Sequence, residues 1–143
     1  MATHYSIFVG SVLGASEYVA DAIAEVIKNN GDTVDIKLTP DINDANRDST
    51  WIICTSTHGA GDLPDNIAPF HKQLSETDLG GINAYIIGLG DSSYDTFCYG
   101  AMTMENTLKQ QGATIRTTPL HIDVLQHPIP EDIAVEWLTE QLA

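Results

Sequence analysis

Apolar and polar positions are arranged along the chain in two ways, and each predicts a different secondary structure. Short runs of apolar, β-branched and aromatic residues predict five strands, at residues 4–9, 33–38, 51–56, 84–88 and 115–123. The runs at 51–56 and 84–88 are apolar throughout, which is typical of strands buried on both faces of a sheet. The run at 33–38 alternates between apolar and polar residues, so we expect one of its faces to be more exposed.

Between these runs, apolar residues recur at the three- and four-residue spacing of helices that are buried on one side. The predicted helices are one over Val19, Ile23, Val26 and Ile27, a short one over Ile67, Phe70 and Leu74, one from about residue 99 to 111, and a last one that opens at residues 130–132. We expect Gly31 and Gly112 to end two of these helices and Pro69 to lie in the first turn of the short one. The polar stretch 41–48 is predicted to be a connection.

Strands and helices therefore alternate five times, without repeats or low-complexity segments. Two strands that are apolar throughout indicate a parallel sheet covered by helices on both faces. With right-handed crossovers, residues 1–143 are predicted to form a single, doubly wound α/β domain. Ligands of such sheets bind beyond the carboxyl ends of the strands. Three loops of unusual composition leave strands there, at 10–17, 56–66 and 88–98, so we expect them to share one ligand.

The loop from Gly10 to Glu17 joins the first strand to the first helix and has the composition of an anion site. The first N–H groups of a helix lack intrahelical acceptors, and the helix dipole adds partial positive charge there. Ser11 and Ser16 add hydroxyl donors, and the glycines let the backbone curl around a tetrahedral group such as phosphate. Taken alone, the loop is equally compatible with an ordinary turn between a strand and a helix.

Each of the other two loops carries one ring. His58 lies among the glycines of the second loop, and Tyr94 lies between Asp91 and Asp95 in the third. A phosphate site at one end and two flat side chains at the other predict a phosphorylated planar heterocycle held by stacking. Each ring also has an ordinary interpretation by itself, with Tyr94 packed on the core and His58 as a solvated loop residue.

Charge and composition restrict the possible partners. Six basic and twenty acidic residues give a formal net charge of −14, which disfavours nucleic acid and anionic membrane surfaces but suits a basic protein partner. Hydrophobic residues form 43% of the chain, enough for a core, yet no segment approaches the roughly 20 apolar residues of a membrane span. The first residues lack the basic region of a signal peptide, and Cys54 and Cys98 form no CxxC pair. We therefore expect a reduced, cytoplasmic protein.

Several classes of protein that use related folds lack their residues here. A phosphoacceptor signalling domain needs paired acids after the first strand and a lysine after the fifth, but Gly10-Ser11 follows the first strand and no lysine follows the fifth. No Gly-Lys-Ser/Thr follows Gly14, which argues against a P-loop. The run Gly88-Leu89-Gly90 lacks the third glycine of a dinucleotide fingerprint. The five histidines show no clustered ligand spacing, so we expect no metal.

Together the three loops resemble those of flavodoxins and of the flavodoxin-like domains of diflavin reductases, and the resemblance covers essentially the whole chain. In length and loops the chain is most similar to MioC-type members of this family. The family's first loop wraps the phosphate of FMN and matches Ser11, Val12, Leu13, Gly14, Ala15 and Ser16. Threonines are frequent at the positions of Val12 and Leu13, so this chain departs from the family there and must rely on backbone contacts.

The second and third loops match longer motifs of the family. The Thr-Tyr-Gly-x-Gly-x-x-x-Asp-Asn loop of diflavin-type domains matches residues 57–66, with His58 at the position of the stacking aromatic. A Gly-Leu-Gly-Asp-x-x-Tyr-x-x-Phe-Cys loop matches residues 88–98, with Tyr94 as the other stacking ring. The resemblance, extended to the end of the fifth strand, implies a cofactor site of Ser11, Val12, Leu13, Gly14, Ala15, Ser16, Thr57, His58, Gly59, Ala60, Gly61, Gly90, Asp91, Tyr94, Phe97, Cys98 and Asp123.

The resemblance also implies a fold and a function. The fold is a flavodoxin-like three-layer sandwich with strand order 2-1-3-4-5, for which flavodoxin with bound FMN is the standard example. The function is that of an electron carrier and not of an enzyme, with no catalytic residues of its own. An NADPH-dependent flavodoxin or ferredoxin reductase would reduce the bound FMN, and an acceptor enzyme, in biotin synthesis for MioC-like proteins, would receive the electrons. We expect a monomer, with a low potential if the acidic loop residues gather at the flavin.

Two alternatives remain open. An NAD(P)H-dependent quinone or azo reductase would turn over NAD(P)H on its own FMN, but the chain offers no obvious nicotinamide site. The other alternative is an interaction module with this fold that binds FMN weakly or not at all. Steady NADPH oxidation by the pure protein with a quinone would support the reductase, and failure to take up FMN would support the interaction module.

Overall fold

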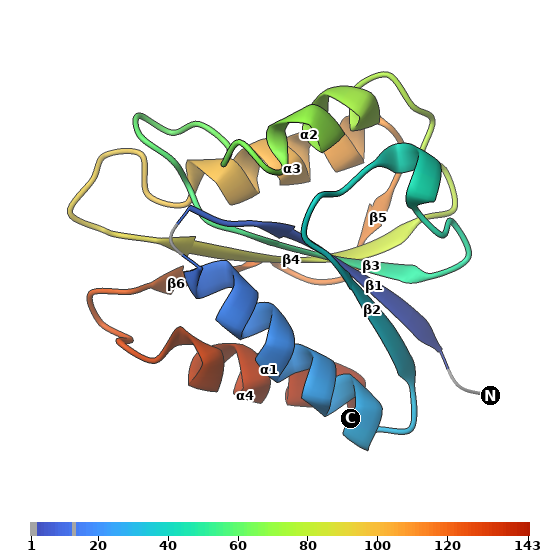
Figure 1. Ribbon diagram of the computed structural model, residues 1–143, viewed down its shortest axis with the longest axis horizontal. Coiled ribbons are helices and arrows are strands. Elements are labelled where there is room, and N and C mark those ends of the chain that lie inside the picture. Colours follow the sequence, from blue (N-terminus) through green and yellow to red (C-terminus); the bar gives the residue numbers. More distant parts are fainter. Residues whose placement is uncertain (1–2, 13) are drawn as a thin grey trace.

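A parallel sheet between two layers of helices forms the centre of the protein (Figure 1). The computed structural model describes residues 3–12 and 14–143. Its strands are β1 (His4–Gly10), β2 (Thr33–Lys37), β3 (Thr50–Thr55), β4 (Asn83–Gly90), β5 (Thr114–Ile115) and β6 (Leu120–Asp123). They run parallel in the order β2-β1-β3-β4-β5, with β6 also beside β4, which confirms the predicted strand order.

The burial of each strand follows from its residue pattern. The apolar strands β1, β3 and β4 are buried along nearly their whole length, because helices cover both of their faces. The alternating strand β2 lies at the edge of the sheet and is half-buried, as its sequence predicted. The β-branched and aromatic residues that fill the central strands are those that pack best on a pleated surface.

The predicted strand at 115–123 is two short strands in the structure. β5 pairs with the start of β4, where Thr114 lies opposite Asn83, and β6 pairs with its end, where Asp123 lies opposite Gly90. Arg116 still donates its N–H to the carbonyl of Ala84 at 2.9 Å, but no strand pairing continues over 117–119, and Pro119 has no N–H to donate to the ladder. A continuous fifth strand is therefore wrong, although both pieces lie along the same edge of β4.

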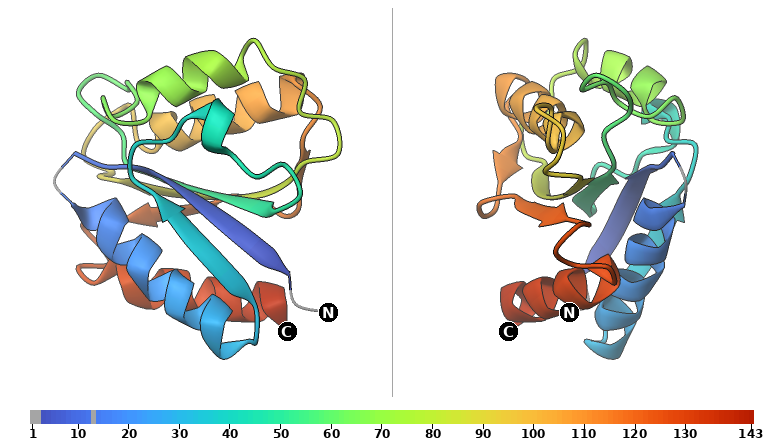
Figure 2. Two further views of the ribbon diagram at one scale, coloured as in Figure 1. Left: turned by 45° about the vertical axis from the view of Figure 1, so that its right-hand side comes forward. Right: turned by 90° about the vertical axis from the view of Figure 1, so that its left-hand side faces the viewer.

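Two helices cover each face of the sheet (Figure 2). α1 (Ala15–Asn29) and α4 (Pro130–Leu142) lie on one face, and α2 (Ala68–Leu74) and α3 (Tyr99–Gln110) lie on the other. One turn of 3₁₀ helix, η1 (Ile42–Asp44), lies in the predicted polar connection. Gly31 and Gly112 take left-handed φ angles of 87° and 98° after α1 and α3, and Pro69 lies in the first turn of α2, as predicted. Within the described ranges, no helix combines the length and apolar character needed to cross a bilayer.

Alternate residues of β1 pack into two separate cores, one under each helix layer. Ile7 and Val9 pack with α1 and α4, whereas Phe8 packs with Trp51 and Phe70 on the side of α2 and α3. The rings of Phe8 and Phe70 stack with their centroids 4.7 Å apart, and Trp51 meets Phe8 edge-on at 5.0 Å. Truncating one such ring to alanine costs typically about 3–5 kcal/mol. These two cores therefore fix the sheet on which the loops are mounted.

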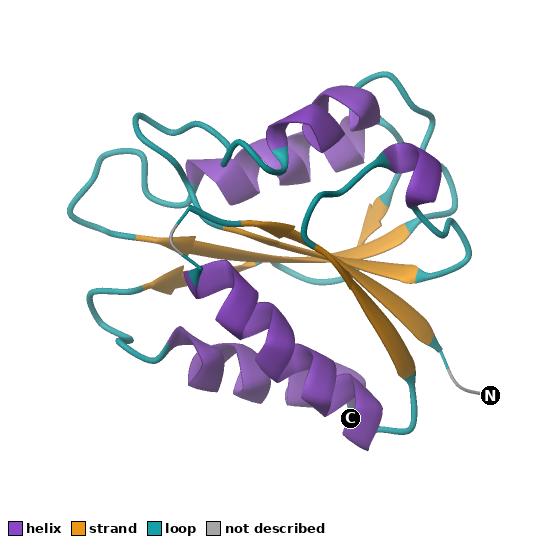
Figure 3. Ribbon diagram, in the orientation of Figure 1, coloured by secondary structure: helices purple, strands orange, loops and turns teal. Residues whose placement is uncertain are grey.

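The loops that follow β1, β3, β4 and β6 leave the sheet at one edge because the strands are parallel (Figure 3). The three loops of unusual composition are among them. The fold therefore brings together segments that are far apart in the sequence.

Candidate functional site

A pocket of about 330 Å³ opens where these loops meet, at the carboxyl edge of the sheet. Small-molecule sites have volumes of about 300–1,000 Å³, so the pocket is large enough for a ligand. Its lining is Val12, Ala15, Ser56, Thr57, His58, Gly59, Leu89, Gly90, Asp91, Tyr94, Thr96, Phe97, Cys98 and Val124. All three of the predicted loops contribute to it.

The first loop supplies backbone donors at the wall of the pocket. Gly14 begins α1 in a left-handed conformation with φ 90°, and its carbonyl accepts the N–H groups of Glu17 and Tyr18. The N–H groups of Val12 and Ala15 have no acceptor within the described residues, and both residues line the pocket. Donors of this kind at a helix N-terminus suit an anion. The predicted contact at Leu13 lies outside the described residues.

The two serines of the first loop serve mainly to hold the loop itself. The hydroxyl of Ser11 accepts a hydrogen bond from the N–H of Gly14 at 2.9 Å. Ser16 is fully buried, and its Oγ lies 2.7 Å from Oγ of Ser56. Neither serine is in the pocket lining, so the hydroxyl contacts predicted for them stay predictions. The partner of Ser16 is the first residue of the second loop, directly after β3, which the local sequence does not reveal.

The second loop turns back on itself beside the pocket. The N–H and carbonyl of His58 pair with those of Asp62, at 2.7 and 2.8 Å, and Gly59 and Gly61 take left-handed φ angles of 53° and 102° inside this turn. His58 and Gly59 line the pocket, whereas the predicted Ala60 and Gly61 do not. Gly61 packs on the start of α3, because a Cβ there would lie 3.0 Å from the ring of Tyr99.

Thr57 joins the second loop to the first turn of α3, the helix that follows the third loop. Its Oγ1 accepts a hydrogen bond from the N–H of Gly100, in the first turn of α3, at 2.9 Å. Gly100 allows this close approach, because a Cβ there would lie 2.6 Å from the carbonyl oxygen of Ser56. The second loop is therefore held against the start of α3, directly after the third loop.

The third loop places rings along the pocket. Tyr94 is 63% exposed at its mouth, and Phe97 is half-buried deeper in the wall. Gly90 lies beneath this wall, since a Cβ there would lie 2.9 Å from the backbone nitrogen of Cys98. Asp91 accepts hydrogen bonds from the N–H and the hydroxyl of Ser93, at 2.8 and 2.6 Å, and so shapes the loop.

Cys98 lines the pocket but is not a nucleophile. It begins α3 with a left-handed φ of 55°, a conformation that residues other than glycine rarely take. Burial, with a smaller effect from the negative charge of Asp123, raises the pKa of its thiol to about 12. The thiol therefore stays protonated at neutral pH, and Cys98 contributes apolar surface to the pocket.

Asp123 ties the third loop to the loop after β6. Its Oδ1 accepts the N–H of Ser92 at 3.2 Å and the N–H of Leu125 at 3.0 Å. The hydrogen bonds from Ser92 are the main cause that holds the pKa of this carboxyl below its usual value. Asp123 is outside the pocket lining, so its contact with a cofactor stays a prediction, and the contacts seen here shape the loops.

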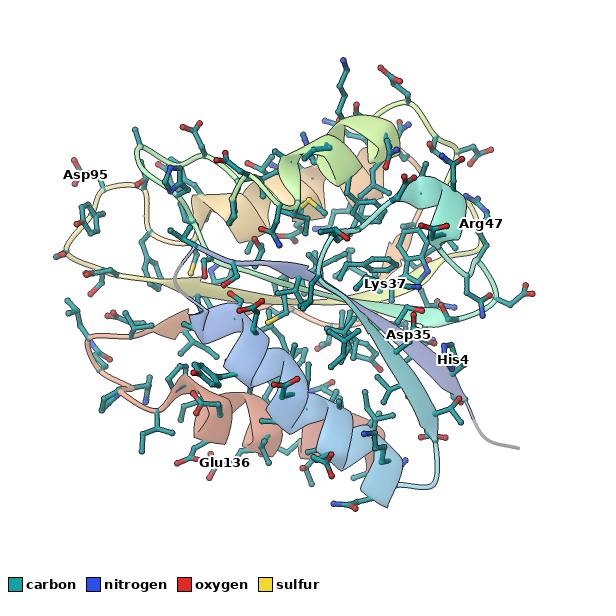
Figure 4. All side chains as sticks on the ribbon, viewed as in Figure 1. His4, Asp35, Lys37, Arg47, Asp95 and Glu136 are labelled. Carbon is teal, nitrogen blue, oxygen red and sulfur yellow. The ribbon has the colours of Figure 1, made fainter. Side chains whose placement is uncertain are left out.

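Most aspartates of the second and third loops lie outside the pocket lining. Asp91 is the only acidic residue in its described lining. Asp62, Asp65 and Asp95 are exposed, and Figure 4 shows Asp95 at the tip of the third loop. Most of the acidic charge on these loops is therefore exposed and lies outside the pocket lining.

Four lining residues were not predicted, namely Ser56, Leu89, Thr96 and Val124. The first three lie inside the loop ranges that the sequence singled out, so the loop composition located them without naming them. Val124 follows directly after β6, and nothing in its local sequence distinguishes it from a core residue.

These residues fit a phosphorylated planar ring. The slot between the second and third loops carries His58 on one loop and Tyr94 on the other, with apolar surface from Leu89 and Val124. Val12 and Ala15, whose N–H groups lack acceptors within the described residues, line the same pocket. A stacking slot next to an anion site, on a parallel sheet with this strand order, defines a flavodoxin-like class of protein.

Comparisons with known proteins agree with that class. The flavodoxin family model matches residues 7–137. The chain is 43% identical over 131 residues to protein MioC of Escherichia coli strain K12, a match that spans 90% of this chain and 89% of that protein. It is 40% identical over 137 residues to the MioC homolog of Haemophilus influenzae, spanning 94% of each. A single-site mutant of a Pseudomonas aeruginosa flavodoxin superposes with a TM-score of 0.91 at 29% identity, over 98% of this chain and 97% of that one.

The chain therefore belongs to the flavodoxin family, and it is similar to MioC proteins over most of its length. Family membership makes it a flavodoxin-like electron-transfer protein, with a flavin as the implied cofactor.

Proposed function

We propose that the protein binds FMN in this pocket and carries single electrons between a reductase and an acceptor enzyme. The observation that carries the proposal is the pocket itself, which combines backbone donors at Val12 and Ala15, without acceptors in the described part of the chain, with the rings of His58 and Tyr94. An anion site without lysine or arginine suits a phosphate monoester. The rings on two separate loops suit a flat heterocycle.

Each part of the site has its own role in this proposal. The backbone N–H groups of Val12 and Ala15 bind the phosphate, while His58 and Tyr94 orient the ring. Leu89 and Val124 exclude water from the inner part of the pocket. Bound FMN supplies the one-electron redox chemistry, and the protein determines its orientation, access and electronics.

The charge distribution supports a low reduction potential. Asp91 lies in the pocket wall, and Asp62, Asp65 and Asp95 are exposed on the same two loops that line the pocket. Negative charge close to the ring disfavours added negative charge on it, so reduction becomes harder. A low-potential donor is the expected result.

The partners follow from the shape and charge of the opening. Tyr94 is 63% exposed there, so the ring stacked on it would lie near the surface and within reach of a docked protein. A net charge of −14 suits partners with basic surfaces. We propose an NADPH-dependent flavodoxin or ferredoxin reductase as the donor and, from the similarity to MioC proteins, an enzyme of biotin synthesis as the acceptor.

An anaerobic reductive titration of the FMN-loaded protein tests the proposed function. We expect reduction in separate one-electron steps, with an EPR signal at half reduction, and rapid reduction by NADPH only when a flavodoxin reductase is added. Steady NADPH consumption by the protein alone with a quinone would instead support the quinone or azo reductase. Direct two-electron reduction without an EPR signal would contradict the one-electron carrier.

A further inference from the structure

The side chain of Asn66 joins the second loop of the site to the first. Asn66 lies at the end of the second loop, two residues before α2. Its Oδ1 accepts a hydrogen bond from the N–H of Ser11 at 3.0 Å. Its Nδ2 donates to the carbonyl oxygen of Val9 at 2.7 Å and to that of Leu38 at 2.9 Å. The half-buried amide of Asn66 thus joins three segments: the end of β1, the residue after β2, and Ser11 in the first loop.

These contacts require an amide in one orientation. The partners are backbone groups, so the N–H of Ser11 can only donate, and the carbonyls of Val9 and Leu38 can only accept. Asn66 satisfies all three with one oxygen and one NH₂ group. An aspartate of the same shape would present an oxygen to both carbonyls and would add a negative charge beside the anion loop.

The contacts also decide which loop donors remain free. Asn66 takes up the N–H of Ser11, and the hydroxyl of Ser11 takes up the N–H of Gly14. Ser11 is thereby fixed at the base of the loop. The N–H groups of Val12 and Ala15 are left at the pocket wall, without an acceptor within the described residues.

The base of the loop is tightly packed as well. Gly10 leaves β1 so close to the segment after Asn66 that a Cβ on it would lie 2.7 Å from Cγ2 of Ile67. The N–H of Ser56 donates to the carbonyl of Gly10 at 2.8 Å. Hydrogen bonding and packing therefore hold the base of the first loop against both ends of the second loop, at Ser56 and at Asn66.

We propose that Asn66 is a positioning residue that keeps the first loop in its anion-binding shape. It thereby sets the preference of the pocket for a phosphorylated flavin over the same flavin without phosphate. The inference rests on the proposed FMN site. Asn66 holds the first loop and is absent from the pocket lining, so its loss acts on the phosphate end and leaves the ring slot in place.

The test compares FMN with riboflavin, which has the same ring and no phosphate. In N66A, we expect FMN to bind about tenfold more weakly, while the Kd for riboflavin changes by less than about twofold. N66D should weaken FMN further and again spare riboflavin, because its charge repels the phosphate. N46A is the matched control, since the Asn46 side chain, in the loop before β3, has one hydrogen bond within the described residues, from the N–H of Asp48 at 2.9 Å. Both flavins should bind N46A as they bind the wild type.

Each result of these flavin titrations supports or overturns the positioning role of Asn66. Riboflavin binding that is retained in N66A also shows that the variant is folded. An equal loss of both flavins would mean that Asn66 merely supports the fold, and it would overturn the inference. Unchanged FMN binding in N66A would overturn the inference alone and leave the proposed function intact. A wild-type protein that takes up neither flavin would overturn the proposed function, and this inference with it.

Discussion

The two ends of the sheet use their polar groups in different ways. At the carboxyl end, loops surround a pocket, the N–H groups of Val12 and Ala15 lack acceptors within the described residues, and Tyr94 is 63% exposed. At the amino end, polar side chains of β1 and β2 bond to one another. The same strands therefore carry a site open to a ligand at one end and a closed polar cluster at the other.

Asp35 on β2 is the centre of the closed cluster (Figure 4). Its Oδ1 accepts the hydroxyl of Ser6 at 2.8 Å and lies 2.9 Å from Nε2 of His4, while Lys37 Nζ lies 3.2 Å from Oδ2. Burial raises the pKa of Asp35, but the hydrogen bonds from Ser6, His4 and Lys37 outweigh it and leave the pKa lowered. Ser6 and His4 both bond to the carboxylate, and this differs from a nucleophilic triad, in which the histidine faces the serine.

The two ends of the sheet differ in whether their polar groups have partners within the protein, and this distinguishes a structural polar cluster from a binding site. Buried polar groups need partners, and at the amino end the protein supplies them from its own side chains. At the carboxyl end the donors are backbone groups of a helix N-terminus beside apolar surface, which the protein leaves to a ligand. Substitutions at the two ends should therefore affect stability and flavin binding separately.

The largest effect is expected for substitution of Gly10, which should lower both the free energy of unfolding and the affinity for FMN. G10A places a Cβ against Thr55 and Ile67, and overpacking of this kind should cost about 3 kcal/mol of the free energy of unfolding. FMN binding should be lost as well, because the first loop must move. Urea denaturation measures the stability, with G80A as the control, since a Cβ there meets only Asp78 at 3.3 Å. A loss below about 1 kcal/mol in G10A would contradict this packing.

Tyr94 separates binding from stability. Y94A should weaken FMN binding by about 1–3 kcal/mol, by analogy with the stacking of bases on aromatic side chains. The free energy of unfolding of the apoprotein should change by less than about 0.5 kcal/mol, because the ring is mostly exposed. Y18A is the control, since Tyr18 is 67% exposed on α1 and does not line the pocket. Equal FMN affinity in Y94A and the wild type would remove Tyr94 from the site.

Asp35 provides the converse test at the amino end. D35N should lower the free energy of unfolding by about 1 kcal/mol at neutral pH, because hydrogen bonds to the carboxylate are weakened. FMN affinity should stay at its wild-type value. An FMN affinity that falls in D35N would show that the two ends are coupled.

The free energies of unfolding of the wild type and D35N should also depend differently on pH. The pKa of Asp35 is lower in the folded state, so its stabilisation is fully present above the unfolded pKa of about 3.9. It is lost as the pH falls through the folded pKa. The stability difference between the wild type and D35N should therefore be constant from neutral pH down to about pH 5 and shrink below about pH 4. A difference that persists at the lowest pH would contradict a role for the charged carboxylate.

The smallest effect is expected at His58, where the family pattern has a stacking aromatic. H58Y should tighten FMN binding by about 0.5–1.5 kcal/mol, because a larger ring faces the slot. A60Y, which alters the same turn outside the pocket lining, should leave FMN affinity unchanged. Weaker binding in H58Y would mean that the imidazole makes a contact that stacking does not replace.

Hydrophobic periodicity predicted the strands and the helix layers, because it reports directly on which face of an element is buried, whereas the strand order came from the resemblance to flavodoxins. The sequence pattern missed the break in the fifth strand, because the effect of Pro119 depends on where β4 offers its hydrogen bonds. It placed the three loops at one edge correctly. The roles of Ser16 and Asn66 were not visible, because their partners lie 40 and 55 residues away along the chain.

Titration of the purified apoprotein with FMN measures directly whether the pocket binds this cofactor. Binding at the pocket stacks the ring on Tyr94 and removes it from water, so flavin fluorescence should be quenched and the absorbance spectrum should shift, with one FMN bound per chain. Riboflavin in place of FMN should bind more weakly, since it lacks the phosphate. A protein that remains colourless, with no quenching at any FMN concentration, would contradict the account.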